Sequence, residues 1–137
     1  MKKVLVFGTF NIIHPGHLNL FRQALSYGDR LYVVLARDTT VKTFKKYTPY
    51  TELERKKKLE QLPMIHKVVL GDQKDRMSCI SLIKPDVICL GYDQRFFIDE
   101  LKQFLEESGL HIPIIRLKEY HADKYKSSKF VSKETTM

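Results

Sequence analysis

Two histidines at the start of a predicted helix are the residues of this chain whose type and spacing suggest chemistry. His14 and His17 lie between an apolar run at 4–7 and an amphipathic segment at 18–25. The run predicts a buried strand and the segment a helix, so both histidines lie in a strand-to-helix turn, on one face of the first helical turn. Because a helix N-terminus offers N–H donors and the positive end of a dipole, two imidazoles there would suit charge on a phosphoryl group.

Glycine and proline residues shape this turn. Gly8 permits a tight turn and a close approach of a ligand to the backbone. Pro15 suits the first turn of a helix, where its missing N–H removes no hydrogen bond. Gly16 lies between the histidines and is expected to leave room for a phosphate.

Apolar runs and helical patterns alternate along the whole chain. The expected strands are 4–7, 31–36, 67–70, 87–90 and 113–117, and the expected helices are 16–26, 51–62, 77–83, 98–107 and one from about 127. Strict alternation predicts right-handed crossovers and a parallel sheet with helices on both faces. The expected fold class is therefore α/β, a Rossmann-like, doubly wound, five-stranded parallel sheet. We expect one domain over residues 1–137, with a frayed tail at about 131–137.

A sheet of this kind binds ligands at the carboxyl ends of its strands, near the switch in strand order. The loops 8–17, 37–50 and 91–97 each follow one of the expected strands, and a short helix could form within the second loop. The histidines, a group of lysines and an aspartate are therefore expected at one edge of the sheet, although they are far apart in the sequence.

The second and third loops carry charged side chains that would fit a nucleotide. Lys42, Lys45 and Lys46 would neutralise a triphosphate, although a solvated basic loop has the same composition. Asp93 offers acceptor oxygens for a ribose hydroxyl, a base amino group or a metal, or it could cap the following helix. Arg37 could bind a phosphate or pair with a neighbouring carboxylate.

Aromatic residues after the fourth and fifth strands would form a wall for a flat ring beside the phosphates. Tyr92, Phe96 and Tyr120 belong to this wall, whereas Phe97 could belong either to the wall or to the core. A site for a flat aromatic ring needs such an apolar wall, and a site for a small polar molecule does not. Arg55 is a single arginine on a lysine-rich helix and is expected at the surface.

The segments Gly8-Thr9-Phe10-Asn11 and His14-Pro15-Gly16-His17 resemble the His-x-Gly-His signature of the nucleotidyltransferase superfamily, which includes cytidylyltransferases and FAD synthases. The superfamily usually has Asp in place of Asn11. The resemblance extends over about residues 2–131. It implies that both histidines are catalytic and that the turn binds the nucleotide through Thr9, Phe10, His14, Pro15, Gly16 and His17.

The resemblance also implies roles for residues outside the turn. Lysines after the second strand contact the nucleotide phosphates in this family, which makes Lys42 a catalytic candidate. Arg55 aligns with an arginine that is often seen in cytidylyltransferases. The segment 125–129 resembles the family's Ser/Thr pair before the last helix, but the arginine that opens the full motif is missing. The implied nucleotide-binding residues here are Lys45, Lys46, Asp93, Tyr120, Ser127 and Ser128, and the acceptor-binding residues are Tyr92 and Phe96.

Several short segments are similar to archaeal-type FAD synthases, namely 36–38, 41–42, 70–71, 84–88 and 90–94. This similarity implies transfer of the AMP moiety of ATP to FMN, with a divalent cation such as Mg²⁺ as cofactor and no metal ligands assigned in the protein. A cytidylyltransferase that makes a CDP-alcohol from CTP and glycerol 3-phosphate, or a related phosphoalcohol, is the alternative. A nucleotide-binding protein with impaired catalysis is a third reading, because Asn11 lacks the charge of the usual Asp.

Composition limits the class of partner. Lys and Arg number 24 against 16 Asp and Glu, and the net charge of +8 favours an anionic partner. No nucleic-acid motif accompanies that charge, so small-molecule substrates are expected and nucleic acid is not. No apolar run approaches the roughly 20 residues of a membrane span.

Cys79 and Cys89 lack metal-ligand spacing and are expected to be reduced core thiols of a cytoplasmic protein. Because dimers are common in the family, a homodimer is a further expectation.

Overall fold

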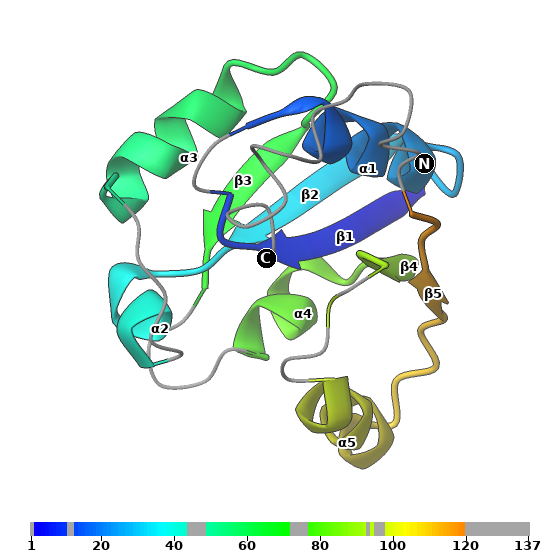
Figure 1. The fold of residues 1–137 in the computed structure, drawn as a ribbon. Coiled ribbons are helices and arrows are strands. Elements are labelled where there is room, and N and C mark those ends of the chain that lie inside the picture. Colours follow the sequence, from blue (N-terminus) through cyan, green and yellow to red (C-terminus); the bar gives the residue numbers. More distant parts are fainter. Residues whose placement is uncertain are drawn as a thin grey trace.

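The computed structural model describes residues 2–10, 13–43, 49–71, 77–92, 94 and 98–119, and of residues 42 and 43 the backbone alone. Strands and helices alternate along the chain as predicted, except that two helices separate the second and third strands (Figure 1). The strands are β1 (Lys3–Gly8), β2 (Arg30–Leu35), β3 (Lys67–Leu70), β4 (Val87–Leu90) and β5 (Ile114–Arg116). The helices are α1 (Pro15–Leu25), α2 (Asp38–Thr43), α3 (Glu52–Glu60), α4 (Ser78–Ile83) and α5 (Ile98–Ser108).

All strand pairs are parallel, and the order across the sheet is β3-β2-β1-β4-β5. The chain moves outward from β1 to β2 and β3, and then returns to the other side of β1 for β4 and β5 (Figure 1). This doubly wound topology confirms the predicted Rossmann-like, five-stranded parallel sheet. The strand order switches between β1 and β4, and the carboxyl ends of these strands mark the place where such sheets bind ligands.

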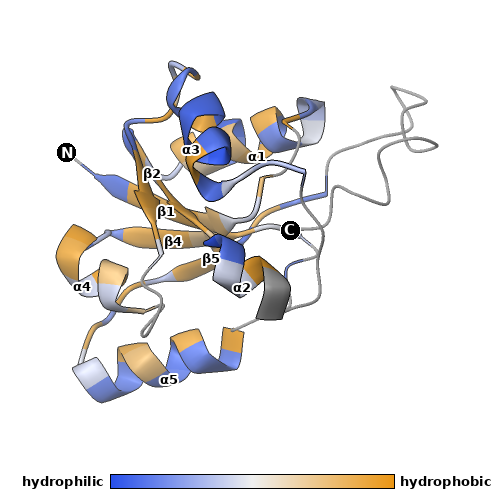
Figure 2. Ribbon diagram, turned by 90° about the vertical axis from the view of Figure 1, so that its left-hand side faces the viewer, coloured by the Kyte–Doolittle hydropathy of each residue, from blue (hydrophilic) through white to orange (hydrophobic). Residues whose placement is uncertain are grey.

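The central strand β1 shows why helices cover both faces of the sheet. Successive side chains of a strand point to opposite faces, and in β1 the residues facing both ways are buried. Val4 and Val6 join a core with α1 and α3, whereas Leu5 and Phe7 join a second core with α4 and α5. Figure 2 shows the apolar strands between these two helical layers. An uninterrupted apolar run is what a doubly covered strand requires.

The observed bounds of the expected helices and strands differ from the predicted ones by at most two residues, and local capping accounts for the start of α3 and the end of α5. Thr51 and Glu54 form a capping box at the start of α3, because each side chain accepts the other's backbone N–H. Gly109, with φ of +68°, follows the end of α5 in the left-handed conformation that glycine tolerates best. None of the described helices is long and apolar enough to span a membrane. The helix expected from about 127 lies outside the described residues.

We expect both cysteines to resist thiol reagents in the folded protein. Cys79 of α4 and Cys89 of β4 are buried, and burial raises the pKa of the Cys89 thiol to about 11. The thiolate is the reactive form, so little of it exists at neutral pH. Labelling with an aromatic disulfide reagent should therefore be slow in neutral buffer and fast in guanidinium chloride. Rapid labelling of both thiols in the native protein would contradict their burial.

Candidate functional site

The histidine turn lies at the carboxyl edge of the sheet, beside the switch in strand order. It follows β1, the central strand, and leads into α1 (Figure 1). Because parallel strands all end at one edge, α2 after β2 and the turn after β4 begin at this same edge. The segments that follow β1, β2 and β4 therefore all begin at one edge of the sheet, as predicted.

His14 caps the first turn of α1. Its backbone is extended, with φ of −138° and ψ of 173°, and its Nδ1 accepts a hydrogen bond from the Gly16 N–H at 3.0 Å. An imidazole nitrogen that accepts carries no proton, so the neutral ring has its proton on Nε2. The cap thus selects the tautomer that carries its proton on Nε2.

The expectation that the start of α1 offers its N–H groups to a phosphate is wrong for the described geometry. Pro15 has no N–H, and the N–H of Gly16 is held by the His14 ring. The N–H groups of His17 and Leu18 both donate to the His14 carbonyl, at 2.9 and 3.2 Å. The helix dipole still favours negative charge at this end, but the hydrogen bonds to a phosphate must come from side chains.

His17 is packed against His14 and is only 4% exposed. The two ring centroids lie 3.9 Å apart with the planes tilted by 35°, and Phe10 meets His17 edge-on at 5.1 Å. The packing fixes both rings in place before any substrate arrives.

Gly16 is required by the His14 ring. A Cβ at position 16 would lie 2.6 Å from His14 Cε1 and 3.0 Å from its Nδ1. The space expected beside Gly16 is therefore occupied, where its Cβ would lie, by the imidazole of His14. A larger residue at position 16 would displace this ring. The sequence predicted that Gly16 leaves space for a ligand. In the structure, the absence of a side chain at Gly16 leaves space for the ring of His14 instead.

Thr9 and Phe10 leave β1 in a strained turn. Phe10 has φ of 51°, which is uncommon for a residue other than glycine, and its buried ring packs on Phe21 of α1 at 5.4 Å. The carbonyl of Thr9 accepts from Nη1 of Arg55 at 2.9 Å. Thr9 was expected to bind the nucleotide, and its carbonyl has a partner within the protein. A strained backbone conformation persists only where the surrounding packing holds it in place. Such conformations are often found at functional sites.

Two side chains that the sequence did not single out hold the turn after β4. Gln94 accepts from the Gly91 N–H at 2.8 Å and donates to the Phe7 carbonyl of β1 at 2.9 Å. Arg116 of β5 donates through Nη1 to the carbonyls of Gly91 and Gln94, at 2.8 and 2.5 Å. The turn contains Tyr92, which is 46% exposed. An aromatic residue is thus presented at the ligand edge on a fixed backbone.

The two arginines near α2 have structural partners. Arg37 donates to Glu52 at 3.2 Å and to the Gly71 carbonyl at 2.5 Å, so of its two interpretations the structure shows the carboxylate pair. The prediction that Arg55 lies at the surface is wrong, because its side chain is fully buried. A signal for this was available, since Arg55 precedes the buried Leu59 by one helical turn.

The other predicted site residues are described only in part. The backbone of Lys42 lies in α2, directly after β2 at the ligand edge. The predicted residues outside the described ranges are Asn11, Lys45, Lys46, Asp93, Phe96, Phe97, Tyr120, Ser127 and Ser128. Within the described ranges, no group of three His, Cys, Asp or Glu side chains could hold a metal ion.

Comparisons with known proteins add sequence and structural relatives. Residues 5–133 match a family model described as cytidylyltransferase-like. The FAD synthase of Methanosarcina mazei is 40% identical over 117 residues, which cover 85% of this chain and 77% of that protein. The FAD synthase of Thermoplasma acidophilum is 36% identical over 128 residues, which cover 93% of this chain and 90% of that one.

A solved structure supports the same relationship. The lipopolysaccharide core biosynthesis protein of Thermoplasma volcanium superposes with a TM-score of 0.82 at 34% identity, over 88% of this chain and 98% of that one. The resemblance inferred from the two segments around the histidines is confirmed, because the family model spans those segments and nearly all of the sheet. The chain therefore belongs to the cytidylyltransferase-like family.

Proposed function

We propose that this protein transfers the AMP moiety of ATP to FMN and so forms FAD and pyrophosphate. The observation that carries the proposal is the packed pair of His14 and His17 at the carboxyl edge of the sheet. That pair belongs to a chain that is 36–41% identical to archaeal proteins named FAD synthase.

The reaction is a displacement at phosphorus. An oxygen of the FMN phosphate attacks the α-phosphorus of ATP, the bond to the bridging oxygen breaks, and pyrophosphate leaves with the electron pair. The attacking oxygen is already ionised, so the step needs positioning and charge stabilisation more than proton transfer. Nε2–H of His14 and the ring of His17 would act on the oxygens where charge builds up.

Lys42, Lys45 and Lys46 would hold the outgoing pyrophosphate. Helix α2 places Lys42 after β2, and mobile ammonium groups suit a charge that shifts during the reaction. Mg²⁺ would share this charge and polarise the phosphoryl oxygens. It commonly binds through substrate phosphates and water with few protein ligands, so we expect the cation to arrive with the triphosphate.

The turn after β4 would bind the acceptor. Tyr92 is exposed there on a backbone that Gln94 fixes, and with Phe96 it would form one wall for the flavin ring. Asp93 and Tyr120 would contact the nucleoside. Ser127 and Ser128 would contact the phosphates as a second cradle.

A substrate panel tests the proposed function. ATP and CTP would each be combined with FMN, glycerol 3-phosphate and phosphocholine, and pyrophosphate release would be followed together with product identity. We expect ATP with FMN to react fastest and to yield FAD. Fast reaction of CTP with glycerol 3-phosphate, without FMN binding, would establish the cytidylyltransferase instead. No turnover with any pair, restored by Asn11→Asp, would indicate impaired catalysis.

His17→Ala should abolish most of the turnover while the protein stays folded. Loss of one well-aimed donor at developing charge costs roughly a hundredfold or more in kcat. FAD formation and far-ultraviolet circular dichroism would be measured together. His111→Ala is the matched control, because His111 is exposed and precedes β5 at the opposite edge of the sheet. Equal rates in the two variants would remove His17 from the mechanism.

Gly16→Ala should lower both stability and turnover, because the added methyl group displaces the capping ring of His14. Loss of the cap costs about 1 kcal/mol of stability. Gly109→Ala is the control for stability alone, since a left-handed residue strains the backbone by roughly 1 kcal/mol and nothing lies near its Cβ. Thermal unfolding and FAD formation would be compared. If both variants lose stability but keep their turnover, the His14 ring does not need its cap to act.

A further inference from the structure

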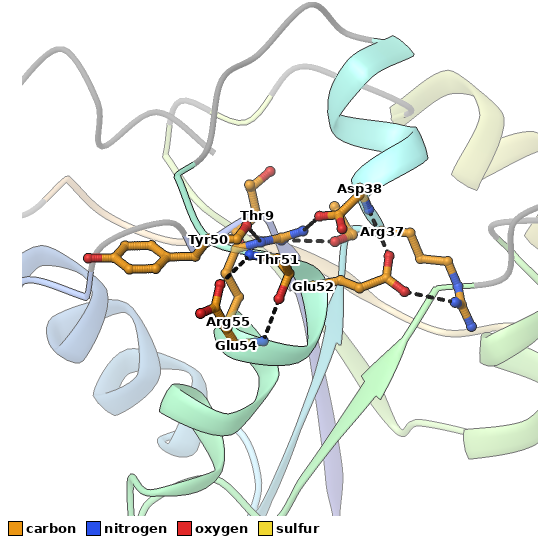
Figure 3. Close-up of polar contacts among 9 residues, drawn as sticks. Thr9, Arg37, Asp38, Tyr50, Thr51, Glu52, Glu54 and Arg55 are labelled. Carbon is orange, nitrogen blue, oxygen red and sulfur yellow. Dashed lines mark hydrogen bonds and ion pairs between the residues drawn. The ribbon is translucent and has the colours of Figure 1, made fainter.

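Arg55 combines complete burial with an unusual number of hydrogen bonds. Its side chain is 0% exposed, although it lies on α3 among lysines that face the solvent. Nη1 donates to the carbonyls of Thr9 and Ala36, both at 2.9 Å. Nη2 donates to Asp38 at 2.9 Å, and Nε reaches the Tyr50 carbonyl at 3.4 Å. Figure 3 shows this guanidinium with its partners around it.

The partners of Nη1 lie where two neighbouring strands separate. Thr9 follows the last residue of β1, and Ala36 follows the last residue of β2. The ladder between them ends with the Ala36 N–H donating to the Gly8 carbonyl at 2.9 Å. Beyond this bond the first strand turns toward the histidines and the second toward α2, and one nitrogen of Arg55 holds a carbonyl on each side.

The partner of Nη2 connects the same guanidinium to α2. Asp38 is the first residue of that helix, and its backbone N–H donates to Glu52 of α3 at 2.9 Å. The other oxygen of Glu52 accepts from Arg37 at 3.2 Å. Helix α2 is thus attached to α3 through both its first backbone N–H and its first side chain (Figure 3).

We propose that Arg55 is a positioning residue that fixes the histidine turn and α2 relative to each other, so that donors for the α-phosphate and for the pyrophosphate are held at one spacing. This inference rests on the proposed function, since it assumes that both ends of one triphosphate bind here. The guanidinium suits the task because its rigid fork reaches several acceptors at once, whereas an ammonium group is a point charge.

A role in stability alone explains the arrangement less well. A buried ion pair is seldom more stabilising than well-packed apolar residues of similar volume, because both charges lose their hydration. Its partner Asp38 is also 41% exposed, so the charge pair itself is open to solvent on one side. What Arg55 supplies and an apolar residue could not is a common attachment for Thr9, Ala36 and Asp38.

The test compares Arg55→Lys with Lys56→Met, which changes the neighbouring residue whose ion pair with Glu60 faces solvent. FAD formation would be measured over ranges of both substrates, and thermal unfolding with and without ATP and Mg²⁺. We expect Arg55→Lys to lose about tenfold to a hundredfold in kcat/KM for ATP, as displaced reacting groups do, and its KM for FMN to stay within about twofold. The rise in Tm caused by ATP should shrink as well.

Asp38→Asn provides a second variant, at a position whose side chain is 41% exposed. It keeps the shape of the side chain but weakens the link to α2, so it should lose ATP efficiency in the same direction and by less. If Arg55→Lys fails to fold, unchanged ATP kinetics in Asp38→Asn would overturn the proposal. A folded Arg55→Lys with the kinetics of Lys56→Met would also overturn it. Failure of the wild type to make FAD would refute the proposed reaction, while the ATP-dependent Tm would still test the role of Arg55.

Discussion

Where parallel strands end, their last backbone N–H and C=O groups no longer have hydrogen-bond partners on the neighbouring strand. The structure of the carboxyl edge of this sheet depends on which other groups bind them. Buried carbonyl and N–H groups without partners are costly, so some other donor or acceptor must reach them. Here long polar side chains do so: Arg55 after β1 and β2, Gln94 and Arg116 after β4, and Arg37 after β3. Each comes from a different part of the chain, so the edge is cross-linked by hydrogen bonds across several elements.

The hydrogen bonds that hold this edge also matter for catalysis. Phosphoryl transfer without a covalent intermediate gains its rate from groups that are already in place when charge develops. The turn of β1 is held on one side by Gln94 at the Phe7 carbonyl and on the other by Arg55 at the Thr9 carbonyl. Directly after these attachments Phe10 takes a left-handed conformation, and its ring packs edge-on against the ring of His17. The same contacts that satisfy the backbone therefore also orient the reactive side chains.

The sequence predicts the parts of this protein that follow from local pattern. The apolar runs predict the strands, the alternation predicts the doubly wound sheet, and the histidine turn appears at the expected edge. It predicts poorly what depends on tertiary contacts. Arg55 has lysines as neighbours and looks exposed, and its spacing to Leu59 is a weak local sign of burial. The acceptors that explain the burial, Thr9, Ala36 and Asp38, lie 46, 19 and 17 residues earlier in the chain. Gln94 is similar, since its acceptor on β1 is 87 residues away. The cap formed by His14 was missed because histidine is an uncommon capping residue.

That cap also determines how the histidine pair can act. While Nδ1 of His14 accepts from Gly16, the ring is neutral, and protonating it would cost the hydrogen bond that starts α1. A general acid would need a proton to give away, but pyrophosphate bound to cations leaves without one. Neutral imidazoles that donate hydrogen bonds are therefore sufficient for nucleotidyl transfer, and the geometry that keeps His14 neutral is compatible with the chemistry proposed for it.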